Sequence, residues 1–272
     1  MPASPRISIC IPHWQVRDMM SICLRSIRKH SRKYDLEVIV VDNGSRDDSL
    51  DYLRSLPWIR LIERPSESVT NWPANVFTAW DAGIRACTGE LFVTMHSDVF
   101  VRQDGWLDPF LREMAVSPCV AATGAWKLAL ENPWYALQKR IVGSLVAQAK
   151  RLAGRRTRSS FREGHYPRDY CAMYRTQTIL EHGLTFCPQD GQITGGFAIA
   201  RQLWDKGCET RMIPVSEIAR KIVHVAHGTA AVSSDKPLHH RAAQRKAERR
   251  AQALLNEAWV DDLRHNRHLD AV

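Results

Sequence analysis

Short apolar runs that alternate with stretches of helical periodicity are the feature that most restricts the fold of this chain. Compact apolar runs occupy 7–11 (ISICI) and 37–41 (EVIVV), and each is followed by turn-forming residues. Between the two runs, apolar residues recur at helical spacing, at Met20, Cys23, Leu24 and Ile27. A strand, a helix and a strand within roughly thirty residues predict a crossover unit whose two strands run parallel.

The same alternation continues to residue 95. Residues 58–63 form a third predicted strand and 91–95 a fourth, and the predicted helix between them ends near Gly89. Helices between apolar strands predict an α/β fold with a Rossmann-like, mostly parallel sheet that has helices on both faces. Because ligands of such sheets bind beyond the carboxyl ends of the strands, polar residues that directly follow a strand are candidates for the site.

These candidates follow the first, second and fourth strands, and they are Pro12, His13, Asp42, Asn43, His96, Ser97 and Asp98. Asp42 and Asp98 place two carboxylates at one edge of the sheet. Each carboxylate needs a partner or contact with water, because an unpaired buried charge is strongly unfavourable. For Asp42, the run DNGSRDDSL also predicts a turn that leads into a helix, which is a purely structural role.

The formal net charge of +9 is concentrated in two segments. Residues 138–162 contain eight Lys or Arg and no acid, and residues 236–250 contain six Lys or Arg and one acid. The remainder of the chain has more acidic than basic residues. Clustered positive charge indicates attraction to a polyanion or to an anionic membrane surface, and the alternative is that both segments are solvated helix faces.

Length and cysteine content set further limits. The 272 residues have an ordinary globular composition, which excludes a mainly disordered or fibrous chain. The sequence has no run of eighteen apolar residues and no leader-like N-terminus, and its seven cysteines form no C-x-x-C pair. We therefore expect a cytoplasmic protein with reduced thiols.

Four stretches carry a resemblance to a known family. They are ISICIPHW (7–14), VIVVDNGSRDDSLDYL (38–53), DAGIRACTGELFVTMHSDVFV (81–101) and IVHVAHGTA (222–230). In order and spacing they resemble the family 2 glycosyltransferases, which are inverting enzymes with the GT-A nucleotide-sugar fold. The resemblance implies a nucleotide-sugar-binding half at 1–124, an acceptor-binding half at 125–232 and a basic helical tail at 233–272.

The resemblance implies that the residues after the first two strands bind the nucleotide. In the family, the acid that closes the second strand hydrogen-bonds the nucleobase, and Asp42 stands at this position. A carboxylate accepts a charge-assisted hydrogen bond from a uracil-type imide N–H, which favours a UDP- or dTDP-sugar as donor. Pro12 and Asn43 would flank the base.

The resemblance also implies a metal site. HSDVFV resembles the D-x-D signature of the family, with His96 at its first acidic position and Asp98 at its last. Asp98 is then the expected ligand of Mn²⁺ or Mg²⁺ bound to the donor diphosphate, and His96 is a further candidate. His227, which Gly228 and a threonine follow, resembles a metal or phosphate histidine of the family, with His224 as the alternative. The alternative is that both are ordinary loop histidines that form hydrogen bonds with the backbone.

An inverting transfer needs a general base for the acceptor hydroxyl. Many relatives have a Glu-Asp pair for which the expected positions here are Gly196 and Phe197, so this sequence departs from the family. Asp190 is the nearest upstream carboxylate and our candidate for the base, and Asp169 is the next. Either residue has a turn role as its alternative.

Three further features concern partners. Trp126 is a candidate for stacking on a saccharide acceptor. The basic residues of 138–162 accompany apolar residues at helical spacing, which predicts either a peripheral membrane contact, suited to a lipid-linked acceptor, or a helix packed on the sheet. The stretch 238–263 predicts a helix docked on the body or on a second subunit.

The resemblance therefore implies metal-dependent transfer, with inversion, of a sugar from a nucleotide-diphosphate donor to a hydroxyl acceptor in bacterial glycan synthesis. A sugar-nucleotide-binding protein with weak catalysis is the alternative, because the acidic pair is absent. A nucleic-acid-binding module would use the basic segments but would leave Asp42 and Asp98 without a role, so no nucleic-acid partner is expected. A nucleotidyltransferase is disfavoured because residues 11–18 offer only Arg17 to a triphosphate.

Overall fold

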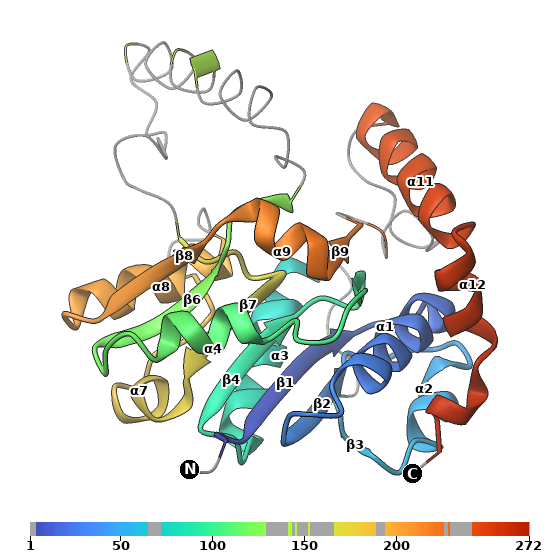
Figure 1. The fold of residues 1–272 in the computed structure, drawn as a ribbon, viewed down its shortest axis with the longest axis horizontal. Helices are drawn as coiled ribbons and strands as arrows, with labels where there is room; N and C mark the ends of the chain where they lie inside the picture. Colours follow the sequence, from blue (N-terminus) through green and yellow to red (C-terminus); the bar gives the residue numbers. More distant parts are fainter. Residues whose placement is uncertain are drawn as a thin grey trace.

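The computed structural model describes residues 4–64, 72–128, 166–188, 194–225 and 241–271, with isolated positions between these ranges. Its centre is a seven-stranded sheet in the order β3-β2-β1-β4-β7-β6-β8 (Figure 1). The strands are β1 (Ile7–His13), β2 (Leu36–Asp42), β3 (Ile59–Glu63), β4 (Leu91–Met95), β6 (Val120–Ala125), β7 (Cys171–Arg175) and β8 (Glu209–Ile213). Strands from both of the expected halves of the chain thus belong to one sheet.

Strand direction is parallel except at β7. β1 pairs in parallel with β2 and β4, β2 pairs in parallel with β3, and β6 pairs in parallel with β8. β7 is antiparallel to both of its neighbours, β4 and β6. The carboxyl ends of the parallel strands therefore meet at one edge of the sheet, and the amino end of β7 lies at that same edge. The predicted mostly parallel sheet is confirmed.

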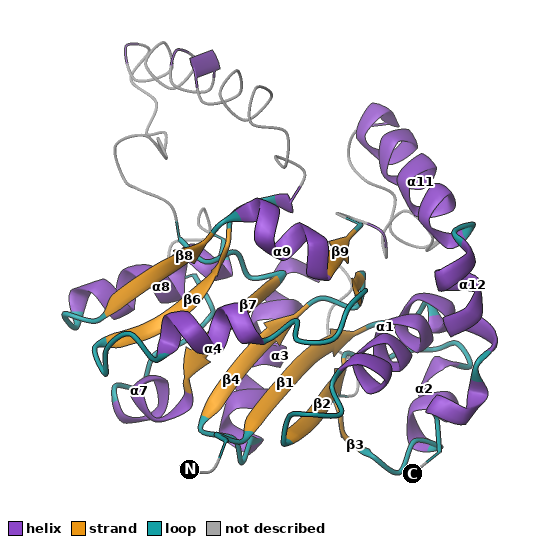
Figure 2. Ribbon diagram, viewed as in Figure 1, coloured by secondary structure: helices purple, strands orange, loops and turns teal. Residues whose placement is uncertain are grey.

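Helices cover both faces of this sheet (Figure 2). They are α1 (Arg17–His30), α2 (Ser49–Arg54), α3 (Trp72–Ala86), α4 (Asp108–Met114), α7 (Thr176–Glu181), α8 (Gly195–Asp205), α9 (Val215–Lys221), α11 (Arg241–Leu255) and α12 (Ala258–His265), followed by the 3₁₀ turn η3 (Arg267–Leu269). α1 and α4 pack on one face and α3 and α8 on the other. In Figure 1, α1 and α4 lie in front of the sheet and α3 lies behind it.

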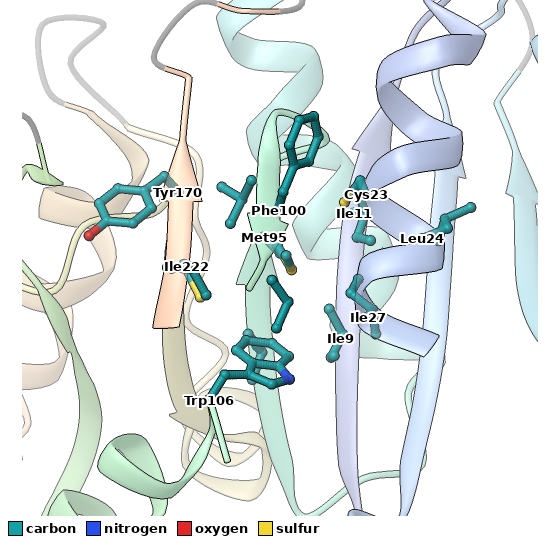
Figure 3. Close-up of a cluster of buried hydrophobic side chains, with 14 of the residues drawn as sticks. Ile9, Ile11, Cys23, Leu24, Ile27, Met95, Phe100, Trp106, Tyr170 and Ile222 are labelled. Carbon is teal, nitrogen blue, oxygen red and sulfur yellow. The ribbon is translucent and has the colours of Figure 1, made fainter. Parts of the chain in front are cut away.

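The side-chain alternation of the strands divides the core into two apolar layers. Ile9 and Ile11 of β1 point into the layer that α1 covers, and Cys10 between them points toward α3. Figure 3 shows the first layer, where Ile27 of α1 packs near β1. On the other face, α3 approaches β1 so closely that a Cβ at Gly83 would lie 2.3 Å from the sulfur of Cys10. A residue without a side chain is therefore needed at this helix position.

A second sheet of two antiparallel strands joins distant parts of the sequence. β5 (Val99–Val101) follows β4 after three residues and pairs with β9 (Ile222–His224). In the register of this pair, Val99 lies opposite His224, the last residue of β9. The short segment between β4 and β5 is thereby held next to the end of β9.

The C-terminal part of the chain packs on the body, as predicted, but not as one helix. α11 ends at Leu255 and α12 begins at Ala258, so the single helix predicted for 238–263 was wrong in its continuity. Glu257 has an extended backbone conformation and interrupts the helical path. Val260 and Leu263 of α12 are buried in the α1 layer. Within the described part of the chain, no helix combines the length and the apolar character needed to cross a lipid bilayer.

Candidate functional site

A cluster of two histidines and one aspartate lies where β4 ends. His96 and Asp98 are in the segment between β4 and β5, and His224 is the last residue of β9. One ring nitrogen of each histidine and one carboxylate oxygen of Asp98 all lie within 4.8 Å of one another. The β5–β9 pairing places His224 here, because it holds the end of β9 beside residue 99.

The polar atoms of this cluster are buried and only partly satisfied. Oδ2 of Asp98 accepts a hydrogen bond of 3.0 Å from the backbone N–H of Gly228. Its Oδ1 lies 3.4 Å from Nε2 of His224 and 3.8 Å from Nδ1 of His96, and it has no hydrogen-bond donor in the described residues. Nε2 of His96 is likewise buried without a hydrogen-bond partner. Buried polar atoms without partners are rare, and two of them at one point fit a site for a cation or a ligand.

The environment of the cluster sets its protonation. Burial lowers the pKa of the His96 imidazole below its ordinary value, although the charges of Asp98 and Asp169 act in the opposite direction. Burial acts to raise the pKa of the Asp98 carboxyl, but the charges of His224 and His96 and the Gly228 hydrogen bond outweigh it, so this pKa is lowered. An ionised carboxylate beside a neutral imidazole is the state in which these groups bind a metal ion.

Two aromatic rings hold the histidines in place. The His96 ring stacks on Trp80 of α3, with ring centres 5.5 Å apart, and the His224 ring stacks on Tyr170, with centres 4.6 Å apart. The two imidazoles face each other edge-on, with centres 5.8 Å apart. The sequence analysis did not identify Trp80 or Tyr170 as site residues, because neither belongs to a motif nor follows a strand.

Asp42 lies at the same edge, two strands from the cluster, and is buried in its own turn. Its Oδ2 accepts hydrogen bonds of 3.0 Å from the backbone N–H groups of Gly44 and Ser45, and its Oδ1 accepts one from the Ser45 hydroxyl. The turn expected as the structural alternative for Asp42 is therefore present. Asn43, also buried, accepts a hydrogen bond of 3.1 Å from Arg64.

The segment after β1 folds toward this turn. Pro12 and His13 end β1, and His13 lies opposite Asp42 in the register of the sheet. Gln15 and Val16 then adopt left-handed backbone angles, with φ of 55° and 62°. Such angles are unfavourable for a β-branched residue such as Val16 and are typical of functional segments held by their surroundings. Here the Val16 N–H donates to the Asp47 carboxylate at 2.9 Å.

A third group of residues continues the edge beyond β4. Trp126 directly follows β6, and its ring meets that of Tyr166 edge-on, with centres 5.2 Å apart. The Arg168 guanidinium lies over both rings and donates a hydrogen bond of 2.6 Å to the Tyr166 hydroxyl. Trp126, our candidate for stacking on an acceptor, therefore lies at the same edge as the cluster and contacts a cation that was not among the sequence-predicted residues.

Asp169 follows directly and is buried. Its Oδ2 accepts a hydrogen bond of 3.2 Å from the N–H of Gly196, in the first turn of α8. The next residue, Tyr170, accepts a hydrogen bond of 3.0 Å from the His96 N–H. Arg168 and Asp169 precede β7, and they reach this edge because β7 runs opposite to its neighbours. Asp169 was already the second candidate for the base, and a search for polar residues before strands, as well as after them, would have added Arg168.

Several sequence-predicted features lie outside the described residues. They include the candidate base Asp190, the candidate ligand His227 and most of the basic segment 138–162. Of that segment, Ile141, Val142, Leu145 and Leu152 are described, and their side chains are exposed.

Comparisons with known proteins agree with this architecture. In sequence, the chain is 28% identical over 122 residues to the O-antigen biosynthesis protein RfbC of Myxococcus xanthus. This match covers 44% of the chain but only 9% of RfbC. In structure, the chain resembles the mannosyltransferase PcManGT from Pyrobaculum calidifontis, solved in complex with GDP-Man and Mn²⁺, with a TM-score of 0.56 at 17% identity. That alignment covers 97% of this chain and 74% of the other.

A second solved structure, S. aureus TarS 1–349, aligns with a TM-score of 0.53 at 13% identity and covers 97% of this chain and 73% of TarS. These likenesses confirm the predicted GT-A-like fold. The family description glycosyl transferase family 2 matches residues 8–183, which is more than half of the chain. The chain therefore belongs to glycosyl transferase family 2.

Proposed function

We propose that this protein transfers a sugar from a nucleotide-diphosphate donor to a hydroxyl acceptor, with inversion at the anomeric carbon and with a divalent metal ion. The observation that carries the proposal is the buried His96–Asp98–His224 cluster, in which Oδ1 of Asp98 and Nε2 of His96 have no hydrogen-bond partner among the described residues. Family membership supports transferase chemistry, and the cluster stands at the edge of the sheet where ligands of α/β folds bind.

Asp98, His96 and His224 would hold the metal ion. One carboxylate and two imidazoles form a mixed set of oxygen and nitrogen ligands, which suits Mn²⁺. Mg²⁺ fits this set less well, because it prefers oxygen ligands. A bound divalent ion neutralises the negative charge that develops on the departing diphosphate. Mn²⁺ in the PcManGT complex supports this assignment by analogy. His227 stays a prediction as a further ligand.

The nucleotide would lie across the ends of β2 and β1. Asp42, with Pro12 and Asn43 beside it, is our candidate for recognition of the base. The turn hydrogen bonds do not exhaust the carboxylate, since each of its oxygens can accept more than one. The Asp42 carboxylate would accept a hydrogen bond from the imide N–H of uracil or thymine, which favours a UDP- or dTDP-sugar. GDP-Man in PcManGT makes a guanosine donor the alternative.

The acceptor would approach from the side of β6 and β7. Trp126 offers a ring to a saccharide there, and Arg168 beside it offers a cation. The name of RfbC supports a role in bacterial polysaccharide synthesis, with a saccharide or lipid-linked acceptor. We place the protein in the cytoplasm, with peripheral contact to the membrane through residues 138–162.

Nucleotide and metal binding test the proposal first. We would measure thermal unfolding with UDP, dTDP and GDP, each with Mn²⁺, with Mg²⁺ and with a chelator. A ligand that binds only the folded state raises the melting temperature, so one diphosphate should stabilise the protein and should need the metal to do so. Equal melting temperatures under all conditions would contradict the proposed function, even though the chain belongs to a glycosyltransferase family.

Substitution of Asp98 tests the role of the cluster. We expect Asp98→Asn to remove the metal-dependent stabilisation and to lower donor turnover at least about 100-fold, because a neutral amide is a poor ligand for a divalent ion. The matched control is Asp104→Asn, which alters an exposed carboxylate after β5. Full turnover in Asp98→Asn would rule out the metal assignment.

A sugar-nucleotide-binding protein without efficient transfer is the second candidate, and the Gly-Phe sequence at 196–197 favours it. The same assays separate the two functions. Metal-dependent stabilisation by a nucleotide, without turnover of any matching nucleotide sugar, would support binding alone.

A further inference from the structure

We propose that Asp169 is the general base that removes the proton from the acceptor hydroxyl. This inference rests on the proposed transferase function and assigns the role for which the sequence left Asp190 and Asp169 as candidates. Three observations support it. The carboxylate lies beside the cluster, only one of its oxygens accepts a hydrogen bond from the described residues, and the other carboxylates of the site have different partners.

Strand pairing places Asp169 beside the metal-binding cluster. β4 and β7 pair with Met95 opposite Cys171, and the next residues remain linked, since the His96 N–H donates to the Tyr170 carbonyl at 3.0 Å. Asp169 is one residue further along this antiparallel pair. The charge of Asp169 acts to raise the pKa of His96, and the ring of its neighbour Tyr170 stacks on His224. The carboxylate therefore lies at the cluster although it is far from it in sequence.

The carboxylate is held firmly by one oxygen only. Oδ2 accepts the Gly196 N–H at 3.2 Å, and the structure gives Oδ1 no hydrogen-bond donor within the described residues. Gly196 permits this approach, because a Cβ there would lie 3.3 Å from the Cβ of Asp169 and 3.1 Å from the Pro167 carbonyl oxygen. Residues 196–197 are Gly and Phe and supply no carboxylate, and a carboxylate from the segment before β7 lies at the start of α8.

The other carboxylates at this edge have different partners. Asp42 is bound within its own turn, and Asp98 belongs to the metal-binding cluster. Asp81 of α3 accepts hydrogen bonds from the Phe186 N–H and the Thr185 hydroxyl, one at each oxygen. In the described part of the chain, Asp169 is the buried carboxylate near the cluster that keeps an oxygen for the acceptor.

The proposed step balances without any further reactant. The acceptor oxygen forms a bond to the anomeric carbon while its proton passes to a carboxylate oxygen of Asp169. The bond between the anomeric carbon and the diphosphate oxygen breaks, and its electron pair leaves with the nucleoside diphosphate. Asp169 afterwards releases the proton to solvent.

The test compares Asp169→Asn, Asp169→Glu, Asp190→Asn and the matched control Asp81→Asn. Asp81 is about as buried as Asp169 and also accepts a backbone N–H, so its substitution reports the cost of removing a buried charge. Release of nucleoside diphosphate would be measured from UDP-, dTDP- and GDP-hexoses, with water and with methyl glycosides as acceptors. Binding would be measured in parallel by thermal shift with the nucleoside diphosphate and Mn²⁺.

We expect Asp169→Asn to lose turnover by about 100- to 10,000-fold, the usual contribution of a general base, while nucleotide and Mn²⁺ binding are retained. The asparagine oxygen can still accept the Gly196 N–H, so the fold should be kept. Asp169→Glu should recover part of the lost turnover, and Asp81→Asn should keep the wild-type rate per folded molecule.

Three results would overturn the assignment. Turnover retained in Asp169→Asn but lost in Asp190→Asn would make Asp190 the base. Loss of nucleotide binding together with turnover in Asp169→Asn would show a structural role. Absence of turnover in the wild-type chain, with nucleotide binding intact, would refute the proposed transfer and the base together, whereas turnover that survives Asp169→Asn refutes the base alone.

Discussion

Asp42 and Asp98 both follow an apolar strand, yet their surroundings give them different chemistry. Asp42 satisfies its carboxylate with the N–H groups and hydroxyl of the turn that follows it. Within the described residues, Asp98 accepts a hydrogen bond from the Gly228 N–H at one oxygen and faces two imidazoles with the other. A carboxylate held by its own turn stabilises the loop and can still accept a further hydrogen bond, whereas a buried carboxylate oxygen without a donor needs a ligand.

A prediction at this scale concerns His13. Burial lowers its pKa from 6.5 to about 4, although the charges of Asp42 and Asp47 oppose this effect. Between these two values the unfolded chain binds a proton that the folded chain does not, so His13 makes stability fall as the pH falls from 6.5 toward 4. At about pH 5 the loss should be about 2 kcal/mol relative to neutral pH.

Urea unfolding at neutral pH and at about pH 5 checks this expectation. His13→Asn cannot ionise, so it should lose about 2 kcal/mol less than the wild type between the two conditions. The control is His182→Asn, which alters an exposed histidine after α7 and should follow the wild type. An equal loss in wild type and His13→Asn would show that His13 does not contribute.

At the scale of elements, the direction of β7 decides the composition of the site. A strand parallel to β4 would have placed Arg168 and Asp169 at the opposite edge of the sheet. Because β7 is antiparallel, the residues before it join the residues that follow β4 and β6. The β5–β9 pair acts similarly, since it positions His224 beside Asp98. Both arrangements depend on contacts between segments that are far apart in sequence.

The C-terminal elements are tied to α1 by a buried ion pair, which allows a second prediction. Arg25 donates hydrogen bonds of 2.8 and 2.6 Å to the two oxygens of Asp270, and Tyr52 donates to the same carboxylate. Asp270→Ala would leave the buried Arg25 charge unpaired. We expect a loss of about 2 kcal/mol, reduced from the fully buried case because Asp270 is partly exposed.

Urea unfolding and limited proteolysis measure this effect. Cleavage should begin in α11 and α12 at lower protease concentration in Asp270→Ala than in the wild type. The matched control is Asp261→Ala, an exposed residue that pairs with His265, and it should change stability by less than about 0.5 kcal/mol. Wild-type stability in Asp270→Ala would show that the Arg25–Asp270 ion pair does not hold the C-terminal elements.

At the scale of the whole molecule, charge is distributed unevenly. The basic segments 138–162 and 236–250 hold the excess positive charge, while the sheet and its helices carry the carboxylates of the site. Of the residues described within the first segment, Ile141, Leu145 and Leu152 expose apolar side chains. Apolar and basic side chains together are the combination that binds an anionic membrane surface.

Vesicle binding tests this arrangement. The protein should sediment with vesicles rich in phosphatidylglycerol but not with phosphatidylcholine vesicles, and binding should weaken from about 0.05 M to about 0.5 M NaCl as charges are screened. Replacement of Lys139, Arg140 and Lys150 by Gln should weaken binding at least about 10-fold, since each base near the surface contributes about 1 kcal/mol.

The matched control changes the same number of charges in the other basic segment, at the exposed residues Arg245, Arg249 and Arg250. An equal loss of binding in both triple variants would show that net charge, and not the segment 138–162, directs the protein to the surface. Equal binding to neutral vesicles would exclude an electrostatic contribution.

Local sequence pattern was sufficient for the sheet, its first four strands and the positions of Asp42 and Asp98. Side-chain periodicity and turn-forming residues are short-range properties, so a chain segment expresses them wherever it lies. The same information located Pro12 and His96 at strand ends, where the structure also has them.

Only the tertiary structure decided which of these residues meet and which others join them. The choice of His224 beside Asp98, the stacking of Trp80 and Tyr170 on the histidines and the arrival of Asp169 at α8 all follow from strand pairing and helix packing. Such contacts depend on strand direction and on close approach of the backbone at Gly196, and neither is encoded in the spacing of residues within one segment.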